Sequence, residues 1–213
     1  MNRARRCVGK NSYQKDLFFN PIEFLEERLL NNESVSWLDI CCGEGHALIE
    51  AATHFAKLSI NKNPANNFHI IGIDIAGMFH QFSTELKYLQ LLEMPVEDFE
   101  PSQEFDLITC VHGLHYIGDK LSVIQKAACW LKKDGVFLAN FEPKSVKLIG
   151  KQNSNGVFSN FLRKQKFTVD YRKHLLTLKG KKNFALSFEY LGADDQAGPN
   201  YTGQPGVDSY YKF

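Results

Sequence analysis

The sequence lacks the patterns of a disulfide-stabilised, metal-binding or membrane-spanning protein. Its five cysteines are an odd number, and no two of them have the Cys-x-x-Cys spacing typical of zinc sites. No stretch approaches the roughly 18 consecutive apolar residues that a membrane-spanning helix needs, and no apolar signal region follows the basic residues 2–6. We therefore expect a cytoplasmic protein with no metal site and no membrane partner.

The sequence also lacks an excess of either charge. Its 25 lysines and arginines balance 24 aspartates and glutamates, which leaves a formal net charge of +1. A nearly neutral chain has no global attraction to a polyanion, so we expect no nucleic-acid partner. The 213 residues, 44% of them hydrophobic, suffice for one domain with a full α/β core, and no pattern indicates an oligomeric state.

Residues 37–48 combine a buried strand, a glycine turn and the start of a helix. Gly43 and Gly45 lie in the turn, where backbone N–H groups point outward and the missing side chains let a ligand approach. Asp74 ends the next apolar run, at a position where a carboxylate can accept hydrogen bonds from both hydroxyls of a ribose. These residues predict a nucleotide-like ligand at the edge of a parallel sheet.

A dinucleotide site would need two features that this chain lacks. Its third glycine would fall on Leu48, and Asp74 lies well beyond the usual distance of about 20 residues. The pattern resembles instead motif I of the class I S-adenosylmethionine-dependent methyltransferases, with an acid, Asp39, ahead of the glycine turn. Cys41 replaces the first glycine of that motif, which is tolerable if its backbone keeps a negative φ.

The resemblance implies S-adenosyl-L-methionine as the cofactor. Asp39 would hold its ammonium group, directly or through water, and Asp74 would hold its ribose. Pro95 stands where the family usually has an acid near the adenine, so we expect Val96 and Glu97 to make that contact. The expected cofactor contacts are Asp39, Cys41, Gly43, Gly45, Asp74, Ile75, Val96, Glu97 and Cys110.

Two histidines follow the fourth expected strand, where the resemblance implies that the chain overhangs the transferred methyl group. His112 or His115 could remove a proton from an acceptor, because imidazole titrates near neutral pH. The structural alternative is that His112 packs against the cofactor while His115 caps a helix or lies in the core. The expected substrate contacts are Tyr13, Tyr116 and Tyr201.

Hydrophobic periodicity predicts strands alternating with helices, which is typical of a doubly wound parallel sheet. Helices are expected at residues 47–57, 120–131 and 157–164, from near residue 76, and once or twice within 11–31. Strands are expected at residues 36–41, 68–74, 88–92, 105–111 and 136–141, with residues 132–135 as a helix end and turn.

Residues 167–178 and 183–191 alternate in hydrophobicity and predict an antiparallel hairpin that turns at residues 180–182. The expected fold is therefore α/β and Rossmann-like: a seven-stranded, mostly parallel methyltransferase sheet with an antiparallel C-terminal hairpin and helices on both faces. We expect one domain, 1–213, with an N-terminal helical cap (1–34), a cofactor-binding core (35–191) and a tail (192–213). Because the tail carries aromatic residues among its glycines and prolines, we expect it to pack back on the domain as a substrate lid.

The expected activity is methyl transfer from S-adenosyl-L-methionine to an oxygen or nitrogen of a small molecule or short peptide. Three alternatives stay open: aminopropyl transfer on the same fold, nucleic-acid methylation, and a cofactor-binding scaffold without catalysis. Acids that would hold a polyamine are missing near the fourth strand, as are the Pro-Cys and Asn/Asp-Pro-Pro-Tyr/Phe sequences of nucleic-acid methyltransferases. Only turnover would separate an enzyme from a scaffold.

Overall fold

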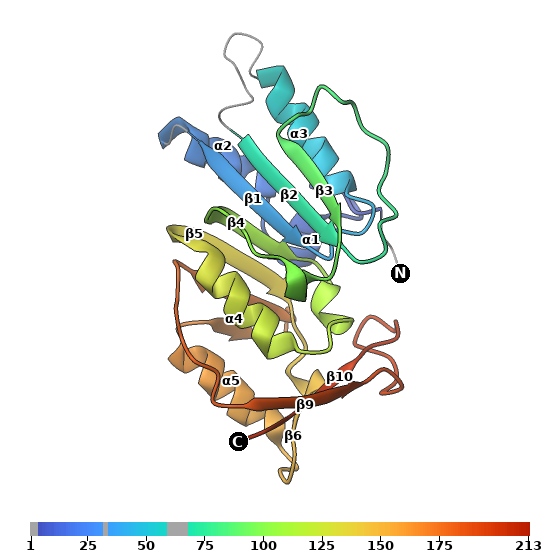
Figure 1. Ribbon diagram of the computed structural model, residues 1–213, viewed down its shortest axis with the longest axis vertical. Helices are drawn as coiled ribbons and strands as arrows, with labels where there is room; N and C mark the ends of the chain where they lie inside the picture. The colour runs from blue at the N-terminus through green and yellow to red at the C-terminus, as the bar shows by residue number, and fades with distance from the viewer. Residues whose placement is uncertain (1–3, 32–33, 59–67) are drawn as a thin grey trace. The chain divides into compact units, whose positions relative to one another are not determined.

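The structure is a computed structural model that describes residues 4–31, 34–58 and 68–213 (Figure 1). The chain divides into two compact units, Met1–Val111 and His112–Phe213. All the expected cofactor contacts belong to the first unit, whereas both candidate catalytic histidines belong to the second. The single domain expected from the sequence stays a prediction.

Among the described residues of the first unit, four parallel strands have the order β3-β2-β1-β4. They are β1 (Val35–Ile40), β2 (Phe68–Asp74), β3 (Leu89–Glu93) and β4 (Phe105–Cys110). Every residue of β1 and β4 is buried, as is usual inside a parallel sheet. The chain continues from β1 to β2 on one side while β4 lies on the other, so the carboxyl ends of β1 and β4 form a topological switch point. Open α/β sheets bind ligands at such a point.

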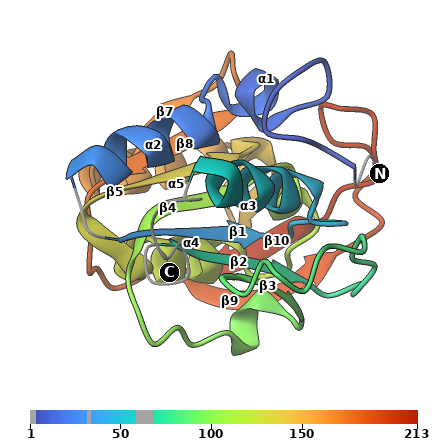
Figure 2. The same ribbon diagram turned by 90° about the horizontal axis from the view of Figure 1, so that it is seen from above.

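Three α-helices lie in the described part of the first unit, namely α1 (Tyr13–Leu17), α2 (Pro21–Asn31) and α3 (His46–Leu58). Helix α3 runs along one face of β1, β2 and β3 (Figure 2). It buries an apolar face at helical spacing, made of Ala47, Leu48, Ala51, Ala52 and Phe55. The ring of Phe55 stacks on that of Phe68 in β2, with 4.5 Å between the ring centroids. The expected N-terminal helices are confirmed, and Pro21 occupies the first position of α2.

The helix expected to begin near residue 76 is absent from the described segment between β2 and β3, so this prediction is wrong. The segment begins with a turn in which the N–H of Ala76 donates to Oδ1 of Asp74 over 2.9 Å. Gly77 then has a φ of 59°, outside the helical region. Met78 is 61% exposed, so the segment offers no continuous apolar face that a helix could bury.

The second unit, residues 112–213, is described throughout. Its strands form the sets β5-β8-β7, with antiparallel neighbours, and β6-β10-β9. The strands are β5 (Leu131–Asn140), β6 (Val146–Leu148), β7 (Thr168–Asp170), β8 (Leu175–Lys179), β9 (Glu189–Asp194) and β10 (Asp208–Lys212). The α-helices are α4 (Lys120–Trp130) and α5 (Ser154–Lys164). The described strands β1–β5, β7 and β8 make up the expected seven, so the α/β Rossmann-like fold class is confirmed.

The hairpin of the second unit turns earlier in the chain than expected. Strands β7 and β8 together span residues 168–179, nearly the range expected for one strand, and the chain reverses at residues 171–174. Oδ1 of Asp170 accepts the N–H groups of Arg172 and Lys173, and His174 takes a φ of 49°, which together close this reversal. Residues 132–135 are likewise no turn, because α4 ends at Trp130 and β5 begins at the next residue.

The tail, residues 192–213, contributes strands to the smaller sheet. Strand β10 pairs in parallel with β6 and antiparallel with β9, so it is the middle strand. The ring of Tyr211 in β10 is buried, and its hydroxyl donates to Oδ1 of Asp119 over 2.9 Å. Nζ of buried Lys120 donates to the carbonyl oxygen of Val207 over 2.6 Å and to Oγ of Ser209 over 2.9 Å. The tail is thus held by its backbone and by two buried side chains.

No helix in residues 4–31, 34–58 or 68–213 is long and apolar enough to cross a membrane.

Candidate active site

The turn that follows β1 holds three residues in the left-handed region of φ. Cys41, Gly43 and Gly45 have φ values of 58°, 62° and 76°. The condition that Cys41 keeps a negative φ is therefore not met, because the cysteine adopts a conformation that glycine adopts readily, at a cost of about 1–2 kcal/mol. The N–H of Cys42 donates to the carbonyl oxygen of Ile73 over 3.0 Å, and this bond holds the turn against the end of β2.

Asp74 ties the turn to the end of β2. Its Oδ2 accepts the N–H of Gly43 over 2.9 Å, and its Oδ1 accepts the N–H of Ala76 over 2.9 Å. Each oxygen keeps a second lone pair, so the carboxylate can also accept a hydroxyl of a ribose. Ile75, the next residue, is 72% exposed and offers an apolar surface beside this carboxylate.

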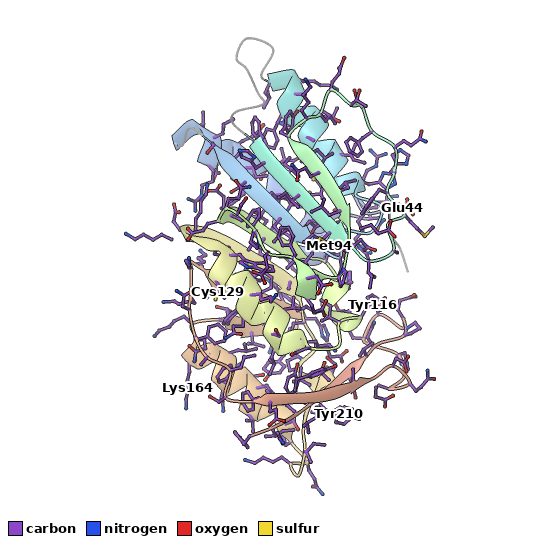
Figure 3. All side chains as sticks on the ribbon, viewed as in Figure 1. Glu44, Met94, Tyr116, Cys129, Lys164 and Tyr210 are labelled. Atoms are coloured by element: carbon purple, nitrogen blue, oxygen red, sulfur yellow. The ribbon has the colours of Figure 1, made fainter. Side chains whose placement is uncertain are left out.

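The residues around Gly45 leave no room for a side chain at this position. A Cβ added to it would lie 2.8 Å from Cδ1 of Leu91 in β3. Glu44 in the same turn and Met94 directly after β3 mark this end of the first unit in Figure 3. The absence of a side chain at Gly45 therefore serves the packing of the turn on β3 in addition to any ligand.

Asp39 is fully buried near the end of β1, with a hydroxyl partner on each oxygen. Tyr13 donates to Oδ2 over 2.5 Å, and Thr109 of β4 donates to Oδ1 over 2.5 Å. Burial raises the pKa of Asp39 from 3.8 to about 7, against the lowering effect of the bonds from Thr109 and Tyr13. Among the described residues no cation pairs with this carboxylate. A positively charged ligand would therefore stabilise its ionised form.

The N-terminal segment supplies one of these partners. Tyr13 is the first residue of α1, whose N-cap Ser12 accepts the N–H of Lys15 over 3.2 Å. The ring of Tyr13 is 3% exposed and packs edge-on against Trp37 of β1, with centroids 6.1 Å apart. The structure thus places Tyr13 on Asp39, at the expected cofactor site, and its contact with a substrate stays a prediction.

The remaining expected cofactor contacts lie at the ends of β3 and β4. Val96 is buried at the start of the 3-10 helix η2 (Val96–Asp98), whereas Glu97 in the same turn is exposed. Cys110, the last residue of β4, is fully buried. These positions follow the carboxyl ends of parallel strands, where ligands of such sheets bind, and their roles stay predictions.

In the second unit, three histidines surround one tyrosine. His112 precedes the 3-10 helix η3 (Gly113–His115), which ends with His115, and His174 ends the turn between β7 and β8. The ring of Tyr201, from the tail, stacks on His174 with centroids 3.7 Å apart and 10° between the planes. The Tyr201 hydroxyl lies 3.4 Å from Nδ1 of His112. The structure therefore brings together both expected histidines and one expected substrate tyrosine.

His115 is the most deeply buried of these imidazoles, at 2% exposure. Its Nε2 is buried without a hydrogen-bond partner, and its ring meets Tyr201 edge-on at 5.1 Å between centroids. Burial, with smaller contributions from nearby His112, Lys120 and His174, lowers the pKa of His115 from 6.5 to about 3. His115 is therefore neutral at physiological pH. Tyr116 follows it, half-buried, with centroids 6.5 Å apart.

The sequence did not identify three residues that complete this cluster. Oδ1 of Asn140 accepts the N–H of His112 over 3.2 Å, and Oε2 of Glu142 accepts the N–H of Tyr201 over 3.3 Å. Both lie at the carboxyl end of β5, and polar residues after a buried strand were a signal that could have indicated them. His174 lies in a turn that was expected to be strand, so no local signal marked it.

In the described ranges, no group of three or more His, Cys, Asp or Glu side chains is arranged to hold a metal ion.

A family model described as a methyltransferase domain matches residues 12–141, more than half of the chain. Two similar curated proteins are ubiquinone biosynthesis O-methyltransferases. That of Actinobacillus pleuropneumoniae is 25% identical over 148 residues, which are 64% of this chain and 58% of that protein. That of Haemophilus ducreyi is 26% identical over 113 residues, 52% of this chain and 46% of its own length. The chain thus spans about half the length of the curated relatives it matches.

Solved methyltransferase structures also resemble parts of the chain. The plantazolicin methyltransferase BpumL in complex with SAH has a TM-score of 0.40 at 15% identity, over 58% of this chain and 46% of that one. PKMT2 from Rickettsia typhi in complex with AdoHcy has a TM-score of 0.38 at 18% identity, over 50% and 21%. The family match confirms the expected class and S-adenosyl-L-methionine as its cofactor, and the chain belongs to the methyltransferase domain family.

Proposed function

We propose that the protein transfers a methyl group from S-adenosyl-L-methionine to an oxygen or nitrogen atom of a small molecule or short peptide. The observation that carries this proposal is the turn of Cys41, Gly43 and Gly45, held by Asp74 and preceded by the buried Asp39. These residues lie at the switch point of a parallel sheet, within a chain of the methyltransferase domain family.

The first unit fits this cofactor in several places. The buried Asp39 carboxylate has two hydroxyl partners and, among the described residues, no cation, so an ammonium group would complete its environment. Asp74 has unused lone pairs for ribose hydroxyls, and the exposed Ile75 beside it offers an apolar surface for the adenine. We assign the edge of the adenine to Val96 and Glu97.

We assign the acceptor to the second unit. His112 comes two residues after Cys110, the last residue of β4, so the chain runs directly from the cofactor unit into the histidine cluster. The bound cofactor supplies an activated methyl group, and the protein has to align the acceptor and exclude water. His112 is half-buried, and its Nδ1 lies near a hydroxyl, so it suits proton removal from an acceptor that needs it.

Calorimetry with S-adenosylhomocysteine tests the cofactor site. Asp74→Ala should weaken binding by about 1.5–3 kcal/mol, because hydrogen bonds to a charged acceptor are the stronger kind. The same change releases the N–H groups of Gly43 and Ala76, so the 2′-deoxy analogue of the ligand is needed as well. It should bind the wild type more weakly than S-adenosylhomocysteine does, whereas the two ligands should bind Asp74→Ala more nearly alike.

Asp195→Ala is the matched control, since it removes an exposed carboxylate from the second unit and should leave affinity unchanged. If the 2′-deoxy analogue bound more weakly than S-adenosylhomocysteine by the same factor in the wild type and in Asp74→Ala, the assignment of Asp74 to the ribose would be wrong. Methyl transfer is then followed with cofactor labelled in its methyl group, against a panel of hydroxyl and amino compounds. Tight binding with no transfer to any of them would favour the scaffold alternative.

A further inference from the structure

Residues 198–206 form a small loop that is closed by its own hydrogen bonds. The N–H of Gly206 donates to the carbonyl oxygen of Gly198 over 3.0 Å, which closes the neck of the loop. Within it, the N–H of Asn200 donates to the carbonyl oxygen of Gln204 over 2.8 Å. Residues 202–205 are exposed, whereas Tyr201 is half-buried. The loop is thus closed by its own hydrogen bonds and carries a tyrosine whose side chain is half-buried.

The Tyr201 ring fills a slot formed by His112, His115 and His174, which we call the histidine slot. His174 covers its face, His115 meets its edge at 78° between the planes, and His112 places Nδ1 beside its hydroxyl. An aromatic ring with stacked and edge-on neighbours is in its preferred surroundings. The histidine slot therefore provides an apolar face, an edge and a polar partner for one phenol.

The slot belongs to the body of the second unit and not to the loop. His112 and His174 have φ values of 57° and 49°, a left-handed conformation that is costly for side-chain-bearing residues. Asn140 fixes the first through its N–H, and the N–H of Phe141 donates to the carbonyl oxygen of His174 over 2.9 Å. Such strain is typical of functional sites, and the backbones of His112 and His174 are held by residues outside the loop.

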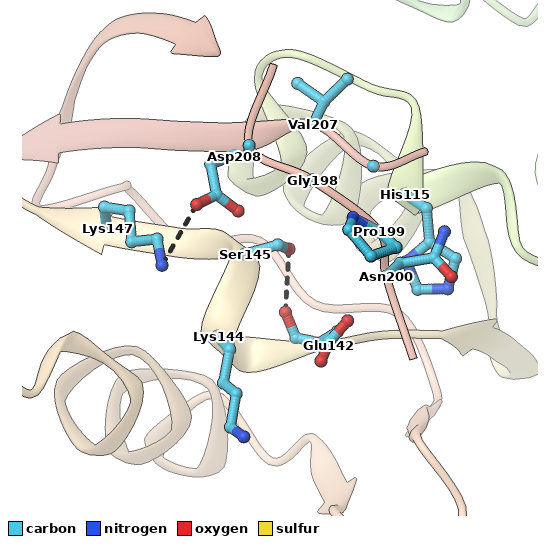
Figure 4. Close-up of a pocket in the computed structure, with 12 residues that line it drawn as sticks. His115, Glu142, Lys144, Ser145, Lys147, Gly198, Pro199, Asn200, Val207 and Asp208 are labelled. Atoms are coloured by element: carbon cyan, nitrogen blue, oxygen red, sulfur yellow. Dashed lines mark hydrogen bonds and ion pairs between the residues drawn. The ribbon is translucent and has the colours of Figure 1, made fainter. Parts of the chain in front are cut away.

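A hydrogen bond joins the loop to this body, from the N–H of Tyr201 to Oε2 of Glu142 over 3.3 Å. Beside the neck lies a cavity of about 200 Å³, lined among others by His115, Glu142 and residues 198–200 of the loop (Figure 4). The next firm attachment of the chain is Val207, whose N–H donates to the carbonyl oxygen of His115 over 2.8 Å. The glycines at the neck permit the backbone rotations by which the loop could lift.

We infer that the histidine slot is a binding site for a phenol ring, and that Tyr201 occupies it in place of the acceptor. This inference rests on the proposed function and names its acceptor class, a phenol methylated on its hydroxyl oxygen. That oxygen forms the new bond to the methyl carbon as the sulfur–carbon bond breaks, and the sulfur keeps the electron pair. The phenol proton goes to Nδ1 of His112. Tyr201 leaves the slot when the acceptor enters.

The test uses 4-methylphenol, which has the structure of the tyrosine side chain, and toluene, which lacks the hydroxyl. Tyr201→Ala empties the slot, so it should bind 4-methylphenol at least tenfold more tightly than the wild type does, and more tightly than it binds toluene. Affinity is followed by the shifts of the imidazole resonances in NMR titrations. Tyr210→Ala, a change to another half-buried tyrosine of the tail, should bind 4-methylphenol as the wild type does.

A folded Tyr201→Ala protein that binds neither compound, or binds both equally, would overturn the inference. The wild type gives a second test that needs no variant. Saturating 4-methylphenol should displace Tyr201 and free its N–H from Glu142, so hydrogen exchange at that amide should accelerate at least tenfold, while toluene has no effect. Unchanged exchange at saturation would also overturn the inference.

Neither measurement involves the cofactor, so the two proposals can fail separately. Methyl transfer to amines by a protein whose emptied slot rejects 4-methylphenol would refute the phenol slot and keep the proposed function. Binding of 4-methylphenol without transfer to any acceptor would keep the slot and refute the proposed function.

Discussion

The glycine turn of the first unit and the Tyr201 ring in the histidine slot of the second are each stabilised by a different kind of interaction. The turn is fixed by backbone groups, with N–H to oxygen distances of 2.9 Å from Gly43 and from Ala76 to Asp74. In the slot the Tyr201 ring contacts His174 and His115, and its hydroxyl lies 3.4 Å from Nδ1 of His112. Backbone hydrogen bonds are directional, whereas ring contacts can be exchanged for those of another ring. The turn is thus suited to one invariant ligand and the slot to a replaceable one.

The largest expected effect is on the free energy of unfolding, and it separates the cost of a packing clash from the cost of backbone strain. Gly45→Val should lower the free energy of unfolding by about 3 kcal/mol, because φ is 76° and the new Cβ lies 2.8 Å from Leu91. Gly203→Val in the loop of the second unit is the matched change, since its φ is 79° and nothing lies within 4 Å. It should cost only the strain, about 1–2 kcal/mol. Equal losses in urea unfolding would mean that Leu91 yields easily.

Acid should lower the free energy of unfolding through His115, because the pKa of this histidine is about 3 in the folded protein and 6.5 in the unfolded chain. The unfolded chain binds the proton first, so this contribution to stability is complete above pH 6.5 and declines toward pH 3. Between pH 6.5 and 4.5 the loss amounts to about 2.5 kcal/mol. His115→Phe should remove that loss, which is measured as the difference in urea unfolding between variant and wild type at the two pH values. The same pH slope in both proteins would show that the slot opens to water.

Asp39 should respond to acid with the opposite sign. Its folded pKa is about 7 and its unfolded value 3.8, so stability from this group is present below pH 3.8 and is lost as pH rises to 7. A bound ammonium favours the ionised carboxylate, so affinity for S-adenosylhomocysteine should rise by up to about tenfold per pH unit below pH 7 and then level off. Calorimetry in two buffers of different ionisation enthalpy should detect the released proton.

Tyr13→Phe sharpens this test. It removes a hydrogen bond that lowers the pKa of Asp39, so affinity should level off at a higher pH than in the wild type. A pH-independent affinity in both proteins would show that Asp39 does not meet the charged group of the ligand.

The smallest expected effect concerns the strained cysteine. Cys41→Gly should raise the free energy of unfolding by about 0.5–1 kcal/mol, since relief of the φ of 58° exceeds the entropy that glycine adds to the unfolded chain. Cys41→Ala keeps the Cβ and should give no such gain. A gain in both variants would assign the cost to the thiol and not to the backbone.

The first unit was largely predictable because its signals are local. Strands β1, β2 and β4 are apolar runs that end in Asp39 and Ile40, Asp74 and Cys110, and each of those ends belongs to the candidate site. The φ of Cys41 could not be predicted, because bonds from Cys42 to Ile73 and from Gly43 to Asp74 impose it across the sheet. The usual preference of non-glycine residues for a negative φ does not hold at Cys41, because tertiary hydrogen bonds fix its backbone.

The second unit was less predictable because its site is assembled from distant segments. His112, Glu142, His174 and Tyr201 come from four places in the chain, and no spacing rule connects them. Residues 183–191 were expected to be the second strand of the hairpin, yet the strand there is β9, residues 189–194, which pairs with β10 in a separate sheet. A single sequence carries the alternation of a strand but not the identity of its partner.

The order of strands in the smaller sheet has a consequence for how the protein comes off the ribosome. Strand β10 lies between β6 and β9, both of which are synthesised before it, so this sheet cannot close until residues 208–212 have emerged. Val207, which anchors the loop of Tyr201 to His115, directly precedes β10. In a nascent chain the three imidazoles would therefore lack this anchored cover until the last strand is made, and a phenol present during synthesis could bind before the tyrosine does.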